Sequence, residues 1–237
     1  MKVILFGATG MVGQGVLREC LLDPEVTEVL AVGRAATGQA DPKLKELVHQ
    51  DFTDFSAVAE RLTGYDACFF CLGISSAGMA EADYRHVTYD FTLAAARVLA
   101  ARNPSMTFIY VSGTGTDSTA RGRSMWARVK GETENALLAL PFKAAYMFRP
   151  GIIQPLHGVK SKTKLYRAAY LVAAPLFPIL RHLTPKHLTT SEQVGRAMLA
   201  VAKRGAPVKH LENVDINAAA VVPTAAGAPT AAGAPGA

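Results

Sequence analysis

The chain has 237 residues and a formal net charge of +6, and half of its residues are hydrophobic while 19% are charged. This length suits one sizeable domain, and the composition excludes a chain that is disordered over most of its length. Three cysteines are too few for a disulfide framework. No zinc-ligand spacing or RNA-binding aromatic signature accompanies the basic charge, so we expect no nucleic-acid partner.

Short apolar runs alternate with helical patterns through the first half of the chain. Strands that are apolar throughout are typical of a parallel sheet covered by helices on both faces. We therefore predict an α/β fold, a Rossmann-type doubly wound parallel sheet, with ligands at the carboxyl ends of the strands. The strand-like runs are KVILFG (2–7), VTEVLAVGR (26–34), YDACFFCLG (65–73), MTFIYVSG (106–113) and KAAYMFRPG (143–151), and helical patterns cover Met11 to Leu22 and Ala80 to Ala101.

The last third of the chain predicts a small, mostly helical C-terminal extension. TTSEQVGRAMLAVAKRG predicts a helix that ends before Gly205, HLENVDI a short strand, and TKLYRAAYLVAAPLFPILRHL a proline-interrupted pair of apolar helices. We predict one domain over residues 1–215, in which 155–215 complete the substrate pocket. The Ala, Pro and Gly of residues 218–237 predict a disordered tail, since they offer almost nothing large to bury.

Three glycines follow the first predicted strand and begin the first predicted helix. Gly7, Gly10 and Gly13 form a G-x-x-G-x-x-G array in VILFGATGMVGQGVL. Glycines in this place permit a tight turn and let the backbone approach a pyrophosphate, while the helix N-terminus supplies N–H donors. The position of the array, with a strand before it and a helix after it, predicts a dinucleotide-binding loop.

The end of the second predicted strand favours NADP(H). An NAD-binding protein would be expected to have an acidic residue there, which bonds the ribose hydroxyls. This chain has Gly33 and Arg34 instead. A guanidinium holds a 2′-phosphate with paired charge-assisted bonds, whereas an acid would repel it. We therefore expect NADP, with NAD as the less favoured cofactor, unless Arg34 is a solvated loop residue.

These motifs and their order resemble the atypical short-chain dehydrogenase/reductases. The resemblance rests on GATGMVG, VGR, HQDFTDF, CLG, YVSGTG, WARVKGETE and RPG, covers about residues 1 to 155, and continues more loosely to about 215. It is closest to the NAD-dependent epimerase/dehydratase-like branch that includes the TIP30-like oxidoreductases, and it implies the same Rossmann fold. The cofactor-binding residues that it implies are Gly7, Thr9, Gly10, Met11, Val12, Gly13, Arg34, Asp51, Phe52, Cys71, Leu72, Gly73, Lys130, Arg149, Pro150 and Gly151.

Within the resemblance, these residues have distinct places. Asp51 and Phe52 are expected near the adenine, and residues 71–73 beneath the cofactor at the fourth strand of the family fold. Residues 149–151 are expected to pass close to the nicotinamide. Taken singly, Asp51 also suits a solvated turn and the Pro-Gly pair at 150–151 a simple strand end.

The catalytic residues that the resemblance implies are Ser112 and Lys130. In the family a serine orients the substrate, a tyrosine exchanges its proton, and a lysine four residues further on binds the ribose and lowers the pKa of the tyrosine. An unperturbed phenol has a pKa of about 10, which a nearby ammonium lowers. Here Trp126 occupies the tyrosine position. Its indole N–H donates a hydrogen bond but exchanges no proton, so Trp126 is no acid or base.

Three alternatives follow from this substitution. In the first, Tyr84, Tyr89 or a threonine of the SGTGT loop supplies the proton. In the second, the reaction needs no protein acid and takes its proton from water. In the third, the protein binds NADP(H) without catalysis, and Trp126 is a stacking surface or an ordinary packing residue. The predicted function is accordingly an NADP(H)-dependent oxidoreductase or epimerase-like enzyme on a small molecule. The alternative is a non-catalytic NADP(H)-sensing or scaffold protein.

A basic segment follows the last motif. Between Lys143 and Lys186 there are eight Lys or Arg residues and no Asp or Glu. Lys160, Lys162, Lys164 and Arg167 suit an anionic substrate with an apolar body, or peripheral contact with a membrane surface through residues 160–183. No transmembrane span is expected, because the uncharged apolar run Ala168–Leu180 has only 13 residues and a spanning helix needs about 20.

The cysteines and histidines predict no further chemistry. Cys68 and Cys71 lie in a strand-like run and suit small buried residues better than a redox pair. The reduced thiols and the lack of a recognisable secretory signal indicate a cytoplasmic protein. His157, His182 and His187 lack ligand spacing, so no metal is expected. Nothing in the sequence indicates the oligomeric state.

Overall fold

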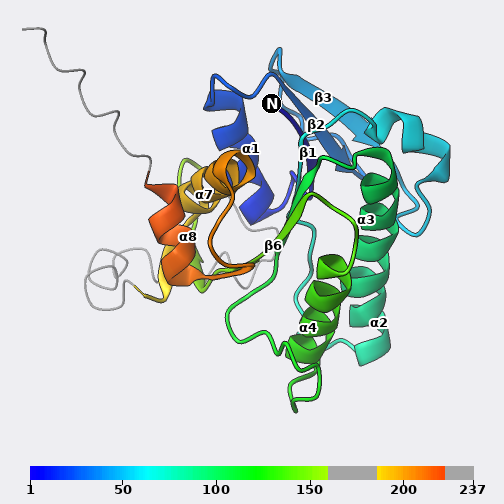
Figure 1. Ribbon diagram of the computed structural model, residues 1–237, viewed down its shortest axis with the longest axis vertical. Coiled ribbons are helices and arrows are strands. Elements are labelled where there is room, and N and C mark those ends of the chain that lie inside the picture. Colours follow the sequence, from blue (N-terminus) through cyan, green and yellow to red (C-terminus); the bar gives the residue numbers. More distant parts are fainter. Residues whose placement is uncertain (160–185, 222–237) are drawn as a thin grey trace, which may run out of the picture.

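A parallel sheet of seven strands forms the centre of the computed structural model, which describes residues 1–159 and 186–221 (Figure 1). The strand order is β3-β2-β1-β4-β5-β6-β9, and every neighbouring pair is parallel. This confirms the predicted Rossmann-type sheet. The strands are β1 (Lys2–Phe6), β2 (Glu28–Gly33), β3 (Leu44–Val48), β4 (Ala67–Phe70), β5 (Thr107–Val111), β6 (Ala144–Arg149) and β9 (His210–Glu212), and a separate parallel pair is formed by β7 (Ile152–Gln154) and β8 (Leu188–Thr190).

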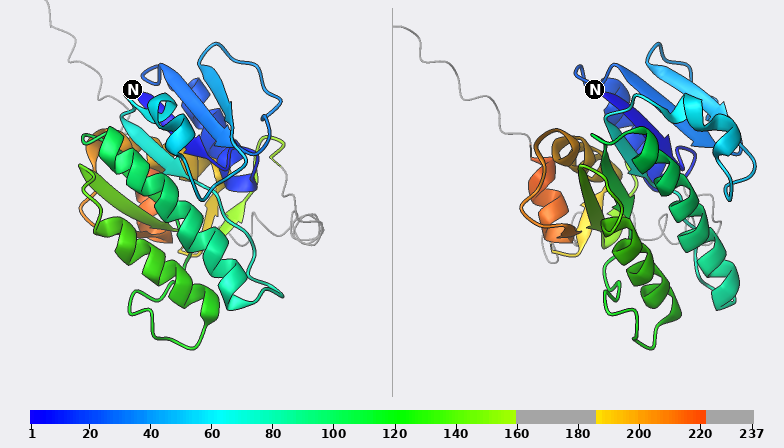
Figure 2. Two further views of the ribbon diagram at one scale, coloured as in Figure 1. Left: turned by 90° about the vertical axis from the view of Figure 1, so that its right-hand side faces the viewer. Right: turned by 45° about the vertical axis from the view of Figure 1, so that its right-hand side comes forward.

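Helices cover both faces of this sheet, as the two turned views show (Figure 2). One layer consists of α1 (Met11–Leu22), α7 (Ser191–Arg204) and α8 (Asn213–Ala220). The other contains the 3₁₀ helix η1 (Ser56–Leu62), the helical stretch α2 (Glu81–Arg85), η2 (His86–Asp90) and α3 (Phe91–Arg102), and α4 (Met125–Leu138). No helix in residues 1–159 or 186–221 is both long and apolar enough to cross a bilayer.

The alternation of side chains along each strand explains the two cores. In β1, Val3 and Leu5 pack under α1 and α7, whereas Ile4 and Phe6 pack under α3, and all four are 0% exposed. Successive residues of a strand point to opposite faces, so a strand buried on both faces must be apolar throughout. This requirement is why the uninterrupted apolar runs of the sequence predicted the sheet.

Two glycines let α1 and α7 pack closely. A Cβ on Gly15 would lie 2.7 Å from the Ser191 carbonyl oxygen, and one on Gly195 would lie 2.8 Å from Cγ of Glu19. The buried Glu19 carboxylate accepts a hydrogen bond from Nε of Arg196 at 3.1 Å. The helix that follows the glycine loop is therefore fixed to the C-terminal part of the domain.

The predicted helix over Ala80 to Ala101 is present and contains one turn of π-helix, η2. A π turn inserts one extra residue into a helix, and such turns occur frequently beside functional sites. The guanidinium carbon of Arg85, the last residue of α2, lies 4.0 Å from the centre of the Tyr89 ring in η2. Contacts along α2, η2 and α3 hold this helical stretch against α4.

The C-terminal part confirms two predictions and corrects a third. Helix α7 is capped by Thr190, whose side chain accepts a hydrogen bond from the Gln193 N–H, and ends before Gly205. Strand β9 covers the first three residues of the predicted HLENVDI strand, whose remaining residues begin α8. The predicted start of the disordered tail at residue 218 is wrong, because residues 218–220 belong to α8 and Ala220 is buried. The predicted apolar helix pair lies outside the described residues.

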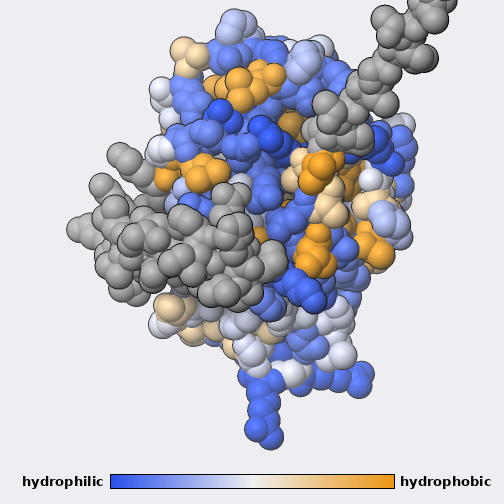
Figure 3. All heavy atoms as spheres, turned by 90° about the vertical axis from the view of Figure 1, so that its left-hand side faces the viewer, coloured by the Kyte–Doolittle hydropathy of each residue, from blue (hydrophilic) through white to orange (hydrophobic). Residues whose placement is uncertain are grey.

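A small apolar hollow lies between the end of α7, α8 and the amino end of β9. Its volume is about 240 Å³, and Val208 and Leu211 line it together with small residues. Apolar side chains are scattered over this face of the molecule (Figure 3). The hollow lies at the amino end of β9, whereas the glycine loop lies at the carboxyl end of β1, so the two occupy opposite edges of the sheet.

Candidate functional site

The glycine loop lies at the carboxyl end of β1, where the sequence predicts the cofactor. Gly7 has a φ of +79°, which favours glycine, and a Cβ there would lie 2.7 Å from backbone atoms of Cys71 and Leu72. The Gly10 N–H donates to the Gly7 carbonyl at 2.9 Å, closing a tight turn. A Cβ on Gly13 would lie 2.1 Å from the same carbonyl oxygen. Gly7 and Gly13 are therefore needed for this turn, whereas a Cβ on Gly10 would lie 3.2 Å from the Gly7 carbonyl oxygen.

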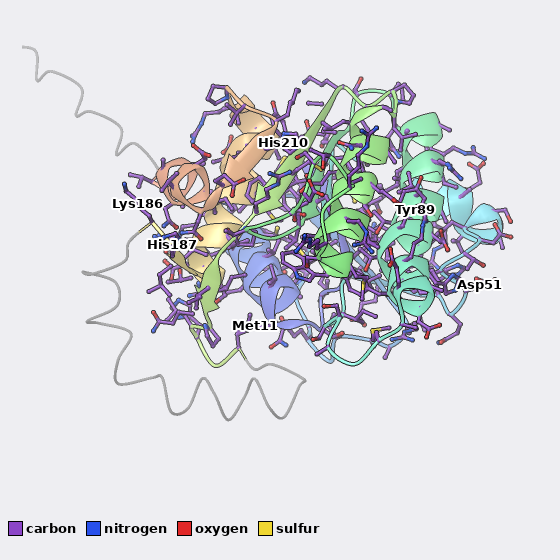
Figure 4. All side chains as sticks on the ribbon, turned by 90° about the horizontal axis from the view of Figure 1, so that it is seen from below. Met11, Asp51, Tyr89, Lys186, His187 and His210 are labelled. Carbon is purple, nitrogen blue, oxygen red and sulfur yellow. The ribbon has the colours of Figure 1, made fainter. Side chains whose placement is uncertain are left out.

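The first turn of α1 fits a pyrophosphate. Its N-cap is Gly10, which offers no side-chain cap, and no acidic residue lies in the first turn. The N–H groups of Met11, Val12 and Gly13 face the end of the helix, where the partial positive charge of the dipole favours an anion. Figure 4 views this edge of the sheet, with Met11 at the start of α1. The loop thus has the shape, donors and charge that a dinucleotide requires.

Arg34 lies just beyond the carboxyl end of β2, and its side chain is exposed. Its backbone carbonyl accepts a hydrogen bond from Nε2 of Gln50 at 2.9 Å. Among the described residues no carboxylate is paired with its guanidinium. The arginine is therefore held by its backbone while its charged group stays available for an anion.

Asp51 and Phe52 follow β3, at the end of the sheet labelled in Figure 4. The Asp51 carboxylate accepts hydrogen bonds from the hydroxyl and N–H of Thr53, which lower its pKa. The Phe52 side chain is 2% exposed and packs edge-on against Phe6 and Phe55. The Phe52 ring therefore belongs to the core, and only its backbone can meet an adenine, while Asp51 forms a surface turn. Their predicted cofactor contacts stay predictions.

The residues after β4 lie directly against the glycine loop. The Cys71 N–H donates to the Phe6 carbonyl at 3.0 Å, which continues the β1–β4 ladder by one residue. Leu72 is half-buried and Gly73 is exposed. Burial raises the pKa of Cys68 and of Cys71, so both thiols are protonated at neutral pH, as expected for structural rather than redox cysteines.

Ser112 and Lys130 meet at the carboxyl end of β5. The Ser112 N–H donates to the Phe148 carbonyl at 2.7 Å, and its hydroxyl lies 2.9 Å from that of Thr116. Lys130 comes from α4, and its Nζ donates to the Val111 carbonyl at 3.3 Å. Burial lowers the pKa of Lys130 to about 8. The two residues predicted as catalytic are thus brought together at the same edge as the glycine loop.

Trp126 lies one turn before Lys130 and packs on the loop after β5. A Cβ built on Gly115 would lie 3.5 Å from the six-membered ring of the indole. The ring therefore covers the backbone of the SGTGT loop. This contact corresponds to the alternative in which Trp126 is an ordinary packing residue. Such a contact holds the loop beside Ser112.

The two tyrosines considered as alternative proton donors, Tyr84 and Tyr89, differ in how exposed their side chains are. Tyr84 is 2% exposed, and burial raises its pKa. Tyr89 is half-buried under the Arg85 guanidinium on η2, and Figure 4 places it well apart from Met11. Tyr84 therefore cannot reach a substrate without rearrangement, whereas Tyr89 is stacked with the Arg85 guanidinium in the helix layer that also contains α4.

The side chain of Arg149 lies in a buried ion pair. Its Nε donates to Oε1 of Glu134 at 3.0 Å, and its other nitrogens reach Glu134, Glu212 and the Ser118 hydroxyl. Glu134 is 0% exposed. The side chain of Arg149 is thus engaged by a buried carboxylate that needs this partner, and the predicted approach of residue 149 to the nicotinamide stays a prediction. Only the Arg149 carbonyl, which accepts a bond from the Thr114 hydroxyl, faces the loop.

Pro150 and Gly151 lie between β6 and β7. The Pro150 carbonyl accepts a hydrogen bond from the Thr114 N–H at 3.0 Å, which ties this turn to the SGTGT loop. A Cβ on Gly151 would lie 2.3 Å from the His187 carbonyl oxygen, so glycine allows the approach of the chain before β8. This joins the site to the segment 186–190, labelled by His187 in Figure 4.

Two features of the site were missed in the sequence. Glu134, within WARVKGETE, is the partner of Arg149, and Asp117 orders the loop before α4 by accepting bonds from Thr119, Arg121 and Gly122. Asp117 is followed by Ser118 and Thr119, and an Asp with Ser and Thr beside it is a recognisable turn signal. The described residues contain no group of three or more His, Cys, Asp or Glu side chains that could hold a metal ion.

Comparison with known proteins agrees with this geometry. The family model described as NAD(P)H-binding matches residues 7–140. A relative from Emericella nidulans, named "Protein fmp52, mitochondrial", is 31% identical over 64% of this chain and 66% of its own length, and "Protein FMP52, mitochondrial" of Saccharomyces cerevisiae is 28% identical over 69% of each. The solved structure of the Bordetella bronchiseptica enzyme WbmF in complex with NAD⁺ matches 92% of this chain and 76% of its own with a TM-score of 0.63 and 15% identity.

The chain therefore belongs to the NAD(P)H-binding family, and it shares the Rossmann fold of the solved WbmF enzyme. It has an NAD(P)-binding domain. The alignments span about two thirds of the length of the fungal relatives. The predicted cytoplasmic location is wrong on this evidence, since these relatives are named mitochondrial. Reduced thiols were a poor guide, because they do not separate the cytoplasm from other reducing compartments.

Proposed function

We propose that the protein is an NADP(H)-dependent oxidoreductase that acts on a small carbonyl or hydroxyl compound. The observation that carries the proposal is that Lys130 lies beside Ser112 at the carboxyl end of β5, on the same sheet edge as the glycine loop. When bound, the cofactor would supply or accept a hydride. Ser112 and Thr116 would orient the reacting oxygen, and Lys130 would hold the ribose.

The preference for NADP(H) over NAD(H) is supported by Arg34. Its guanidinium is exposed beyond β2, where an acid would select NAD, and Gln50 fixes its backbone. A paired charge-assisted contact with a 2′-phosphate is stronger than a neutral hydrogen bond. Titration of NADPH and NADH tests the proposal, with energy transfer from Trp126, the only tryptophan, to the dihydronicotinamide as the readout.

The expected result is tighter binding of NADPH than of NADH, and a loss of at least tenfold in NADPH affinity in Arg34→Ala with little change for NADH. Arg97→Ala is the matched control, because Arg97 is exposed on α3, away from the loop. Binding of neither nucleotide would contradict the proposal. A preference for NADH would contradict only the role proposed for Arg34.

A second candidate function is favoured by Trp126. Since the tyrosine is absent and the indole packs on Gly115, the protein could bind NADP(H) and signal its presence without turnover. The readout that separates the two is oxidation of NADPH in the presence of carbonyl compounds. Peripheral membrane contact through residues 160–183 lies outside the described residues, and liposome flotation of the chain with and without that segment tests it.

A further inference from the structure

We propose that Lys130 is the catalytic acid of this site and donates its Nζ proton to the substrate oxygen, the task that a tyrosine would have on this helix. The proposal rests on the oxidoreductase function proposed above. It assigns Lys130 a second role beside ribose binding, and it is argued from the face of the sheet on which Lys130 lies, from the burial of Tyr110 and Tyr84 and from its charge environment.

Lys130 and Ser112 lie on the same face of the sheet. The Ser112 N–H bond to Phe148 continues the β5–β6 ladder, so Ser112 keeps the alternation of the strand and points to the same face as Tyr110. Lys130 Nζ lies 5.1 Å above the centre of the Tyr110 ring and bonds the Val111 carbonyl. The ammonium therefore lies over the residues that immediately precede Ser112, where the reacting oxygen would be held.

The other proton donors of this region are unsuited to the task. Trp126 exchanges no proton. Tyr110 and Tyr84 are 1% and 2% exposed, and burial raises the pKa of both. The Tyr110 hydroxyl also bonds Thr133. Both phenols are thus closed off from a substrate, whereas Lys130 is only half-buried.

The charges around Lys130 favour release of its proton. From α4 itself, Glu134 is the nearby acid, but its carboxylate is engaged by Arg149 of β6. From β5 the neighbour is the neutral Tyr110, beside which lies the neutral Tyr84 of α2. Among the described residues no carboxylate forms an ion pair with Nζ. Burial without such a partner lowers the pKa of Lys130 to about 8, close to the value at which a general acid works best at neutral pH.

The proposed step transfers one hydride and one proton to the carbonyl group. When bound, NADPH supplies the hydride that forms the new C–H bond at the carbonyl carbon. The π electron pair of the carbonyl moves to its oxygen, which takes a proton from Lys130 Nζ as one N–H bond breaks. The neutral amine then regains a proton from water. Ser112 and Thr116, whose hydroxyls form a pair, would hold the oxygen during this transfer.

The first test measures the titration of the Lys130 amine and requires no catalytic turnover. Competitive acetylation of the whole protein at a series of pH values, quantified by mass spectrometry, gives the midpoint at which each amine becomes reactive, with the exposed Lys143 as internal reference. A Lys130 midpoint near 8 is expected, and protection by saturating NADPH should accompany it. A midpoint near 10 would overturn the proposal, because such an amine is a poor acid at neutral pH.

The second test separates proton donation from cofactor binding. Lys130→Arg keeps a cation that can reach the Val111 carbonyl and a ribose, but guanidinium does not give up its proton. With phenanthrenequinone as the carbonyl probe, we expect NADPH affinity within about threefold of the parent and kcat lower by roughly 10²- to 10⁴-fold. Lys130→Arg combined with Trp126→Tyr should regain part of kcat, since a phenol is then restored.

The outcomes distinguish the two proposals. Unchanged kcat in Lys130→Arg would overturn the role of Lys130 and leave the oxidoreductase function standing. A parent chain that binds NADPH but never oxidises it, while Trp126→Tyr does, would overturn both and favour the sensor. Equal losses of kcat and NADPH affinity in Lys130→Arg would assign Lys130 to ribose binding alone.

Discussion

Gly13 lies so close to Gly7 that a Cβ on Gly13 would be 2.1 Å from the Gly7 carbonyl oxygen. The contact is with backbone, which cannot move aside as a flexible side chain does. The turn that presents the N-terminus of α1 therefore depends on the absence of a side chain at residue 13.

Gly13→Ala should lower the free energy of unfolding by about 1–3 kcal/mol, the usual cost of inserting an atom into a packed region, and should weaken NADPH binding. Urea denaturation and nucleotide titration measure the two effects. Gly73→Ala is the control for stability, because a Cβ there meets nothing within 4 Å. If Gly13→Ala were as stable as Gly73→Ala, the close approach of Gly13 to the Gly7 carbonyl would be contradicted.

Breaking the Arg149–Glu134 pair should be costly. Glu134→Ala leaves a mostly buried guanidinium without its principal partner, and removal of one member of a buried pair typically costs about 3–5 kcal/mol. The control is Glu60→Ala, which removes an exposed partner of Arg102 and should cost at most about 1 kcal/mol. Denaturant midpoints measure both, and similar values for the two variants would contradict a structural role for the buried pair.

The loop before α4 should respond to acid. Hydrogen bonds from Thr119 and from the Gly122 and Arg121 N–H groups lower the pKa of Asp117 to about 2. Because the folded pKa is below the unfolded value of about 3.9, the carboxylate stabilises the folded chain above pH 4, and this contribution is lost as the pH falls from about 4 towards 2. Asp117→Asn should flatten this dependence relative to the surface control Asp83→Asn, as measured by denaturation at several pH values.

The sequence could predict those features that are determined by residues close together along the chain. The glycine loop and the strands were predicted because turn geometry and burial on both faces constrain residues that are neighbours in sequence. The Arg149–Glu134 pair was not, since it joins residues of β6 and α4 that meet only when the helix packs on the sheet. The burial of Phe52 among Phe6 and Phe55 is equally a tertiary effect.

The start of α8 was missed although a local signal existed. Glu212 and Asp215 form a capping box, in which each side chain bonds the backbone of the other. The composition of the following Ala-rich segment outweighed that signal in the prediction from sequence. Ala220 is buried against the α7 layer, so packing extends the helix into residues that composition alone assigns to the tail.

The buried amine of Lys130 should give stability an alkaline dependence. Its folded pKa, about 8, is below the unfolded value of about 10.4, so between these values the unfolded chain binds more protons than the folded one. Burying the cation therefore costs stability below pH 8, and that cost is relieved as the pH rises from about 8 to about 10.4. Lys130→Met removes the titrating group.

The predicted quantity is the difference in free energy of unfolding between the parent protein and Lys130→Met. The free energy of unfolding of the parent, minus that of Lys130→Met, should rise over this range, and the difference cancels the titration of groups that both share. Saturating NADPH should shift the rise to higher pH, since a ribose that bonds the ammonium favours its charged form. A difference that stays constant from pH 7 to 11 would show that the Lys130 ammonium is solvated, and it would remove the support that its environment gives to proton donation.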